Sequence, residues 1–396
     1  TIAVVAPGIA ASSSAVKSFN KALGKGVNLG NELESPSEGT WGPMLDSTDL
    51  SIIAARGFNS VRAPIRWDGI GDDIDDTFDR ALRTPPYTID PRFFVRVDSL
   101  VTWARRNHLL LILNDHHHDS LLENYEHELP RFLSIWEQVS NRYKDLPSDS
   151  VAFEILNEPV GQINAGRWNW LLDTTLKIIR TTNPVRPVLI GTADWGGTNS
   201  LGALRLPLDS NLILTIHDYD PKPFVYQGAS WMSMPKGVAW GGYWDVRNAI
   251  EGADMLHRYA TAHDIPVNIG EFGTTLVSDS VSRHKWIAAK TRLYENRGFS
   301  WAYWNFKERE MGLYSMAKEA WNDNQVGALF STDTSLLILG EPPTPESDLI
   351  FNGQFDRDTG WILPLTDGGK ATLTIDSGFA TIDLQENPTQ INWAAS

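Results

Sequence analysis

The chain has 396 residues, enough for one large domain and a small appendage. Its 34 basic and 49 acidic residues give a net charge of −15, which argues against nucleic acid as a partner because a polyanion would be repelled. The absence of cysteine excludes disulfides, thiolate catalysis and cysteine-ligated metal centres. No run of the sequence is long and apolar enough to span a membrane.

The first residues of the chain are apolar and end in small side chains (TIAVVAPGIAA, 1–11). This pattern is typical of the end of a signal peptide, and a frayed tail would explain it equally well. We therefore expect residues 1–16 to form an N-terminal tail of one of these two kinds.

Eight short apolar runs then alternate with longer amphipathic stretches. The runs predict strands buried on both faces, because their Val, Ile and Leu content is nearly continuous. The amphipathic stretches include residues 50–56, 93–107, 168–182 and 254–263. Eight such alternations predict a (β/α)8 TIM barrel over residues 17–340, and no glycine-rich nucleotide fingerprint follows any run. The strand candidates are 26–30, 59–65, 109–114, 151–157, 187–191, 212–217, 266–272 and 299–306.

The composition changes after the barrel. Residues 341–347 (EPPTPES) are rich in proline and predict a stiff linker. Residues 348–396 alternate polar and apolar side chains and have no helical period, which predicts a β-rich segment. The segment is short for a complete β-sandwich, so we expect a truncated carbohydrate-binding module.

Polar residues stand at the ends of the strand runs, where barrels of this kind carry their active sites. Glu158 ends the fourth run and Glu271 ends the seventh. One carboxylic acid can protonate a glycosidic oxygen while the other attacks the anomeric carbon from the opposite face, so the pair predicts glycoside hydrolysis. Sixteen tryptophans suit either a large aromatic core or a cleft that stacks against sugar rings. The other polar or aromatic strand ends are Arg62, Asn114, His116, Asn157, His217, Tyr219 and Trp304.

Five of these stretches form a recognisable series. They are GVNLGNELE (26–34), FEILNEP (153–159), IHDYDP (216–221), IGEFG (269–273) and WAYWNF (301–306). Their order and spacing, over about residues 24–330, resemble glycoside hydrolase family 5. The opening motif is most similar to a bacterial subgroup that acts on β-1,4-glucan and sometimes on mannan.

The resemblance implies a retaining endo-β-1,4-glucanase that needs no cofactor or metal. Glu158 would be its acid/base and Glu271 its nucleophile. Asn157 would hold the sugar 2-hydroxyl, Arg62 would keep Glu271 ionised, and Tyr219 would hydrogen-bond Glu271. The histidines would bind hydroxyls and tune the carboxylates, and a tryptophan would stack on the reactive sugar. The residues implied in these further roles are His116, His217, Trp304, Asn31, Glu34, His117, Tyr226 and Trp231.

The sequence departs from the family pattern at two places. Tyr226 stands where the subgroup usually has histidine, which leaves binding beyond the reactive sugar open. Three consecutive histidines, 116–118, follow the third strand where the family shows one or two, which leaves the functional one open. The substrate alternatives are mannan, glucomannan and xyloglucan. The implied partner is a β-glucan polysaccharide or oligosaccharide, met outside a bacterial cell or in its periplasm by a monomeric enzyme.

Two other classes of function are consistent with parts of the sequence. A metal-dependent barrel hydrolase could use His116 and His118, whose spacing suits a metal and which have Asp115 and Asp119 beside them. A non-catalytic carbohydrate-binding barrel would be expected to have lost one of the two glutamates, and both are present.

Overall fold

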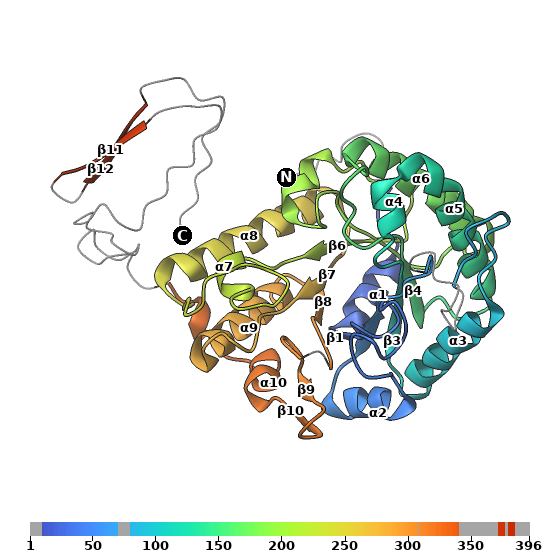
Figure 1. Cartoon of the computed structure of the whole chain (residues 1–396), viewed down its shortest axis with the longest axis horizontal. Helices are drawn as coiled ribbons and strands as arrows, with labels where there is room; N and C mark the ends of the chain where they lie inside the picture. The colour runs from blue at the N-terminus through green and yellow to red at the C-terminus, as the bar shows by residue number, and fades with distance from the viewer. Residues whose placement is uncertain (1–9, 70–79, 308, 340–370, 377–378, 385–396) are drawn as a thin grey trace. The chain divides into compact units, whose positions relative to one another are not determined.

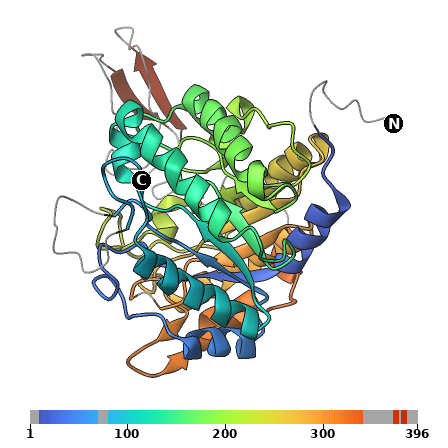
Figure 2. The same cartoon turned by 90° about the vertical axis from the view of Figure 1, so that its right-hand side faces the viewer.

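The computed structural model describes residues 10–69, 80–307, 309–339, 371–376 and 379–384. Eight parallel strands pair in chain order and close into a barrel, with helices on its outer side (Figure 1; Figure 2). The predicted (β/α)8 fold is confirmed, and each predicted strand overlaps an observed one. The barrel strands are β1 (Lys25–Asn28), β2 (Ser60–Ala63), β3 (Leu110–Asn114), β4 (Val151–Glu154), β5 (Val188–Ile190), β6 (Leu212–His217), β7 (Val267–Phe272) and β8 (Ser300–Tyr303).

The helices begin and end at residues suited to those positions. Asp46 and Asp49 form a capping box at the start of the second helix, which ends before Gly57 at a φ of 100°. Asp279 accepts two backbone N–H groups at the start of the ninth. The α-helices are α1 (Ser14–Leu23), α2 (Ser47–Arg56), α3 (Pro91–Arg106), α4 (Asp119–Glu123), α5 (Tyr125–Arg142), α6 (Ala165–Thr182), α7 (Lys222–Val225), α8 (Tyr243–Ala262), α9 (Ser280–Glu295) and α10 (Asp323–Leu329). The 3-10 helices are η1 (Thr198–Ala203) and η2 (Ser335–Leu337).

Helix α1 closes the end of the barrel where the strands begin. The hydroxyl of Ser13 caps the helix, and Leu23 leads directly into β1. One face of α1 packs on interior residues of four strands, and this cluster is almost completely buried. The helix begins at Ser14, so the last residues of the expected tail 1–16 are helical. The cluster comprises Val16, Phe19, Leu23, Ile112, Ala152, Leu189 and Ile213.

The strand pairing becomes irregular at the opposite end. The register between β6 and β7 shifts after Ile216, so that His217 pairs with Glu271. The register between β7 and β8 also shifts, between Ile269 and Phe272. Bulges of this kind re-aim side chains and are common beside active sites. They bring residues of β6 and β7 together at the mouth of the barrel.

The chain divides into two compact units. The first, Thr1–Gly241 with Asn248–Leu337, holds the barrel and a small sheet of β9 (Tyr314–Ser315) and β10 (Ala320–Trp321). The second, Gly242–Arg247 with Ile338–Ser396, holds an antiparallel hairpin of β11 (Ala371–Asp376) and β12 (Phe379–Leu384). The hairpin lies within the predicted β-rich segment, while the predicted linker 341–347 lies outside the described residues. None of the helices in the described ranges has the length and hydropathy to cross a membrane.

Candidate active site

The guanidinium of Arg62 lies at the centre of the barrel mouth and is completely buried. It binds Glu154 of β4 through Nε and Nη2, each at 2.7 Å. Nη1 donates to Asn28 at 2.8 Å and to Glu271 at 2.7 Å, and Nη2 also donates to Asn157 at 2.8 Å. Five N–H donors therefore meet five acceptors, which belong to four residues on or shortly after three strands, β1, β4 and β7. Burial alone would lower the pKa of Arg62, but the charges and hydrogen bonds of Glu154 and Glu271 raise it, so the side chain stays charged.

Two members of this network, Asn28 and Glu154, are absent from the predicted site. Glu154 is 1% exposed, and both oxygens of its carboxylate accept from the guanidinium of Arg62. The sequence does indicate that Glu154 is paired, because a charged residue inside an apolar strand needs a partner of opposite charge when it is buried. Arg62 and Glu154 both interrupt such strands and could have been paired on that ground.

Glu271 is held on both carboxylate oxygens. Oε1 accepts from Arg62, and Oε2 accepts from the hydroxyl of Tyr219 at 2.9 Å. Burial, followed by the charge of Glu271, raises the pKa of Tyr219 well above its usual range, so its hydroxyl remains a donor. These contacts fix the orientation of the carboxylate at the end of β7.

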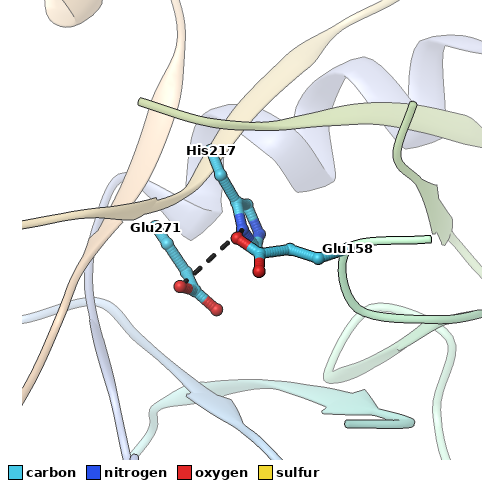
Figure 3. Close-up of side chains that lie close together, drawn as sticks. All are labelled: Glu158, His217 and Glu271. Carbon is cyan, nitrogen blue, oxygen red and sulfur yellow. Dashed lines mark hydrogen bonds and ion pairs between the residues drawn. The ribbon is translucent and has the colours of Figure 1, made fainter. Parts of the chain in front are cut away.

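Glu158 lies across the mouth from Glu271 in the loop after β4. Its backbone φ is 43°, an unusual value for a residue other than glycine and one often found at functional sites. Its Oε1 lies 2.7 Å from Nδ1 of His217, which in turn lies 3.7 Å from Oε2 of Glu271. Figure 3 shows the three side chains converging from separate strand ends. The side chain of Glu158 is 23% exposed and that of Glu271 is 6% exposed, so Glu158 is the more accessible of the two to solvent.

The ring of His217 is positioned between the two carboxylates. Burial lowers its pKa, but the charge of Glu271 and the hydrogen bond and charge of Glu158 outweigh burial, so the pKa is raised. Gly270 makes room for the ring: a Cβ there would overlap Oγ1 of Thr215 and lie 3.3 Å from Nε2 of His217. This is a physical reason for glycine before Glu271.

Glu158, His217 and Glu271 each offer one ligand atom within 4.8 Å of the others, the arrangement that a metal ion could use. However, Arg62 and Tyr219 already donate to both oxygens of Glu271, and the nitrogen of His217 is engaged with Glu158. Proton donors on the would-be ligands favour an acid–base site over a cation site. Among the described residues, neither His116 nor His118 belongs to a group of this kind.

The three consecutive histidines have different surroundings. His116 stacks on the indole of Trp304 at a ring-centroid distance of 5.7 Å. Burial lowers the pKa of His116 far below its usual value, so it is neutral. His117 is half-buried, and its ring meets the edge of Trp41 at 5.7 Å. His118 is fully buried and binds Asp115 at 2.8 Å. The structure thus brings His116 and His117 to the mouth and turns His118 into the protein.

Trp304 follows β8 and is half-buried at the mouth, while Trp301 and Tyr303 are completely buried. Trp301 packs against Phe58 and Phe272 with edge-to-face geometry. The alternation of strand residues predicts this division, because neighbours point to opposite faces. Trp304 therefore presents an indole at the mouth beside His116.

Glu34 is completely buried behind Asn31. Its carboxylate accepts the backbone N–H groups of Asn31 and of Glu32, the latter at 3.0 Å. Burial raises the pKa of Glu34 to about 7, although these hydrogen bonds lower it. Burial also raises the pKa of Glu32 to about 9, against the charge of Lys307. Asn31 is half-buried, and its φ of 66° lies in the left-handed region.

Further aromatic residues lie in the segments that follow β5 and β6. Tyr226 is half-buried and lies against Tyr219 at 5.2 Å, whereas Trp231 is 54% exposed. The prediction missed Trp195, which is 58% exposed and precedes Gly196. A Cβ on Gly196 would lie 3.7 Å from Glu158, so this loop borders the carboxylate. In the sequence, only the DWGG stretch after the fifth strand could have indicated Trp195 as a residue near the site.

A (β/α)8 barrel with two carboxylates facing each other across its mouth is typical of the barrel glycoside hydrolases. The family profile described as Cellulase (glycosyl hydrolase family 5) matches residues 21–310. The chain belongs to glycosyl hydrolase family 5, as the motifs predict.

Named relatives and solved structures agree with this assignment. Endoglucanase H of Acetivibrio thermocellus is 34% identical over 317 residues, which are 79% of this chain and 33% of that protein. Endoglucanase 3 of Fibrobacter succinogenes is 27% identical over 72% of this chain and 50% of its own length. The chain thus spans a third to a half of these two relatives. The crystal structure of endoglucanase Cel5A from Thermotoga maritima is 39% identical, with a TM-score of 0.75 over 79% of this chain and 99% of that one.

Proposed function

We propose that the protein is a retaining endo-β-1,4-glucanase that hydrolyses internal bonds of cellulose or mixed-linkage glucan. The observation that carries this proposal is the distance between Glu158 and Glu271, which each have a carboxylate oxygen within 4.8 Å of the other. Retaining glycosidases place their two carboxyl groups about 5–5.5 Å apart, whereas inverting ones need about 6.5–9.5 Å to admit a water molecule.

In the first step, a carboxylate oxygen of Glu271 bonds to the anomeric carbon as the glycosidic C–O bond breaks. Glu158 gives its proton to the departing oxygen. In the second step, Glu158 takes a proton from water, whose oxygen bonds to the anomeric carbon from the opposite side and releases Glu271. The two steps together retain the anomeric configuration.

The surrounding groups suit these roles. Arg62 supplies positive charge and orientation to Glu271, and its bond to Oδ1 of Asn157 directs the amide of Asn157 for a sugar 2-hydroxyl. Trp304 offers a flat apolar face for the reactive sugar. We assign the exposed ring of Trp195 to the leaving-group side, because the next residue, Gly196, borders Glu158. Neither step requires a metal or an organic cofactor.

The choice of glucan over mannan rests on the relatives. Endoglucanase H, Endoglucanase 3 and Cel5A bear names of glucan-cutting enzymes. Cel5A has also been solved with mannotriose and with cellobiose. An activity panel on soluble cellulose, mixed-linkage glucan, mannan, glucomannan and xyloglucan tests the choice, and a higher kcat/KM on mannan than on every glucan would contradict it.

Azide separates the roles of the two glutamates. We expect Glu158→Ala to regain activity with azide on an aryl glycoside, because the glycosyl-enzyme forms but lacks its general base, and the product is a β-glycosyl azide. We expect Glu271→Ala to yield only an α-glycosyl azide. Exchange of these two results between the variants would show that the roles are reversed.

We also propose that the enzyme acts outside the cell or in the periplasm, as a monomer. A β-glucan polymer is too large to be taken up intact, so the enzyme that cuts it internally must meet it there. The apolar character of residues 1–11, typical of the end of a signal peptide, supports export.

A further inference from the structure

One face of helix α9 contacts the segment that follows β6. Trp286, Lys290 and Tyr294 are spaced four residues apart, so they lie on one side of the helix. Nζ of Lys290 lies 2.8 Å from both carboxylate oxygens of Asp218, and the hydroxyl of Tyr294 donates to Asp218 at 2.7 Å. Nε1 of Trp286 donates to the backbone oxygen of Asp220 at 3.0 Å. Three side chains of one helix thus hold two residues of this short segment.

The position of Asp218 in the chain gives these contacts their meaning. Asp218 lies between His217, which binds Glu158, and Tyr219, which binds Glu271. Successive residues of an extended chain point to opposite sides, so Asp218 faces α9 while its neighbours face the mouth. The backbone N–H of Asp218 also donates to the backbone oxygen of Glu271 at 2.9 Å. Any shift of Asp218 would therefore move the partners of both glutamates together.

We propose that Lys290 and Tyr294 are positioning residues for the two glutamates, acting through Asp218 on the His217–Glu158 and Tyr219–Glu271 hydrogen bonds. This inference rests on the proposed function of Glu158 and Glu271. Both residues are buried, Lys290 at 4% and Tyr294 at 2% exposure, and both bind the carboxylate of Asp218. Their polar contacts with the segment after β6 are made to Asp218. The ring of Tyr294 also packs against Phe272, which follows Glu271, and Tyr294→Phe leaves that ring contact in place.

The charged groups around this contact are few. Asp218 and Asp220 supply negative charge from the segment after β6, and Lys290 of α9 and Lys222 of α7 supply positive charge. The ammonium of Lys290 lies 5.6 Å from the ring of Trp286. Removing one partner of a buried pair leaves the other uncompensated, so Asp218 would rotate toward solvent when Lys290 is replaced. The hydrogen bonds of its two neighbours would then lengthen.

The test uses three variants of the full chain. Tyr294→Phe removes one hydrogen bond and keeps the ring, which packs against Phe272 at 5.3 Å. Lys290→Met removes the charge at similar volume, and Lys290→Arg restores it. The matched control is Arg180→Met, which breaks another partly buried ion pair, between α6 and Asp209, before the start of β6.

We expect kcat on soluble β-glucan to fall about 10-fold in Lys290→Met and less in Tyr294→Phe, with KM nearly unchanged, because small misplacement of catalytic groups costs rate heavily. Lys290→Arg should recover most of the rate, and Arg180→Met should match the wild type. A second readout, NMR titration of His217, needs no substrate. The groups facing His217 are Glu158, Glu271, Arg62 and His116.

The pKa of His217 is raised because Glu271 and Glu158 outweigh burial. It should fall in Lys290→Met and Tyr294→Phe as the ring leaves Glu158, and it should not fall in Arg180→Met. An unchanged pKa or an unchanged kcat in both α9 variants would overturn the inference, as would an equal effect of Arg180→Met. A wild-type protein inactive on every β-glucan would instead refute the proposed function, while the titration still decides whether α9 controls His217.

Discussion

Replacing Arg62 with lysine tests whether the buried guanidinium sets both the stability and the chemistry of the barrel mouth. Arg62 makes five hydrogen bonds, three of them to the carboxylates of Glu154 and Glu271. Lysine keeps the charge but has only three donors. At least two buried bonds are therefore lost, and a bond to a charged group contributes about 1.5–3 kcal/mol. The expected loss in the free energy of unfolding is about 3–6 kcal/mol.

The structure provides a matched control in Arg186. Arg186 is also buried, and its guanidinium makes five hydrogen bonds, but all five acceptors are neutral and lie at the end of the barrel where β4 and β5 begin. Burial lowers the pKa of Arg186 to about 10, opposite in direction to the shift of Arg62. Arg186→Lys also loses at least two bonds of a charged donor, so we expect a similar loss of about 3–6 kcal/mol in the free energy of unfolding, and the two variants should differ in activity.

Urea unfolding followed by tryptophan fluorescence gives the two stabilities, and initial rates on a soluble β-glucan give kcat/KM. We expect Arg62→Lys to lose at least about 100-fold in kcat/KM, since both Glu271 and Asn157 lose their fixed orientation. Arg186→Lys should retain wild-type kcat/KM. The reasoning fails if Arg62→Lys unfolds within about 1 kcal/mol of the wild type, or if the two variants lose the same activity.

Three further predictions concern the aromatic strand, the buried acids and the C-terminal segment. Trp304→Ala should lower kcat/KM at least about 100-fold, or roughly 2.7 kcal/mol of transition-state binding, in a folded protein. Trp301→Ala should instead cost about 3–5 kcal/mol of stability, because it leaves a cavity in the core. Kinetics and thermal melting of both variants test this, and a folded but inactive Trp301→Ala would reverse the assignment. Burial raises the pKa of Glu32 from 4.5 to about 9, so the folded protein holds a proton that the unfolded chain releases. The contribution of Glu32 protonation to the free energy of unfolding is therefore complete below pH 4.5 and is lost as the pH rises through 9. Glu32→Gln should flatten that decline in urea melts at pH 5, 7 and 9, and an identical slope would count against it. A chain stopped at Gly340 should keep its fold and its activity on soluble substrate, because the barrel unit ends at Leu337, and loss of either would show that the remaining segment is part of the same unit.

The strands and the two glutamates could be predicted because their signals are local. Continuous apolar runs mark strands buried on both faces, and polar residues at the ends of these runs mark the mouth. The alternation within β8 likewise separates Trp301 from Trp304, which the structure places on opposite faces. Each of these inferences needs only the order of residues along one segment.

The contacts within the site could not be predicted in the same way, because they join segments far apart in the chain. Glu154 and Arg62 are 92 positions apart, and only the closed barrel brings them to 2.7 Å. The order of His116, His117 and His118 does not reveal that the last turns inward toward Asp115, since that depends on the backbone after β3. The shift in register after Ile216 is also invisible in the sequence, although it pairs His217 with Glu271.

The position of helix α1 has a consequence for how this enzyme can be combined with other modules. Its packing on Ile112, Ala152, Leu189 and Ile213 closes the barrel at the end where the strands start, and the glutamates open at the other end. A tag, anchor or second domain joined ahead of Ser13 would therefore approach from the rear of the catalyst. Such a fusion would leave the mouth of the barrel, where Glu158 and Glu271 lie, unobstructed, and a surface that immobilises the protein through its N-terminus would present that mouth outward.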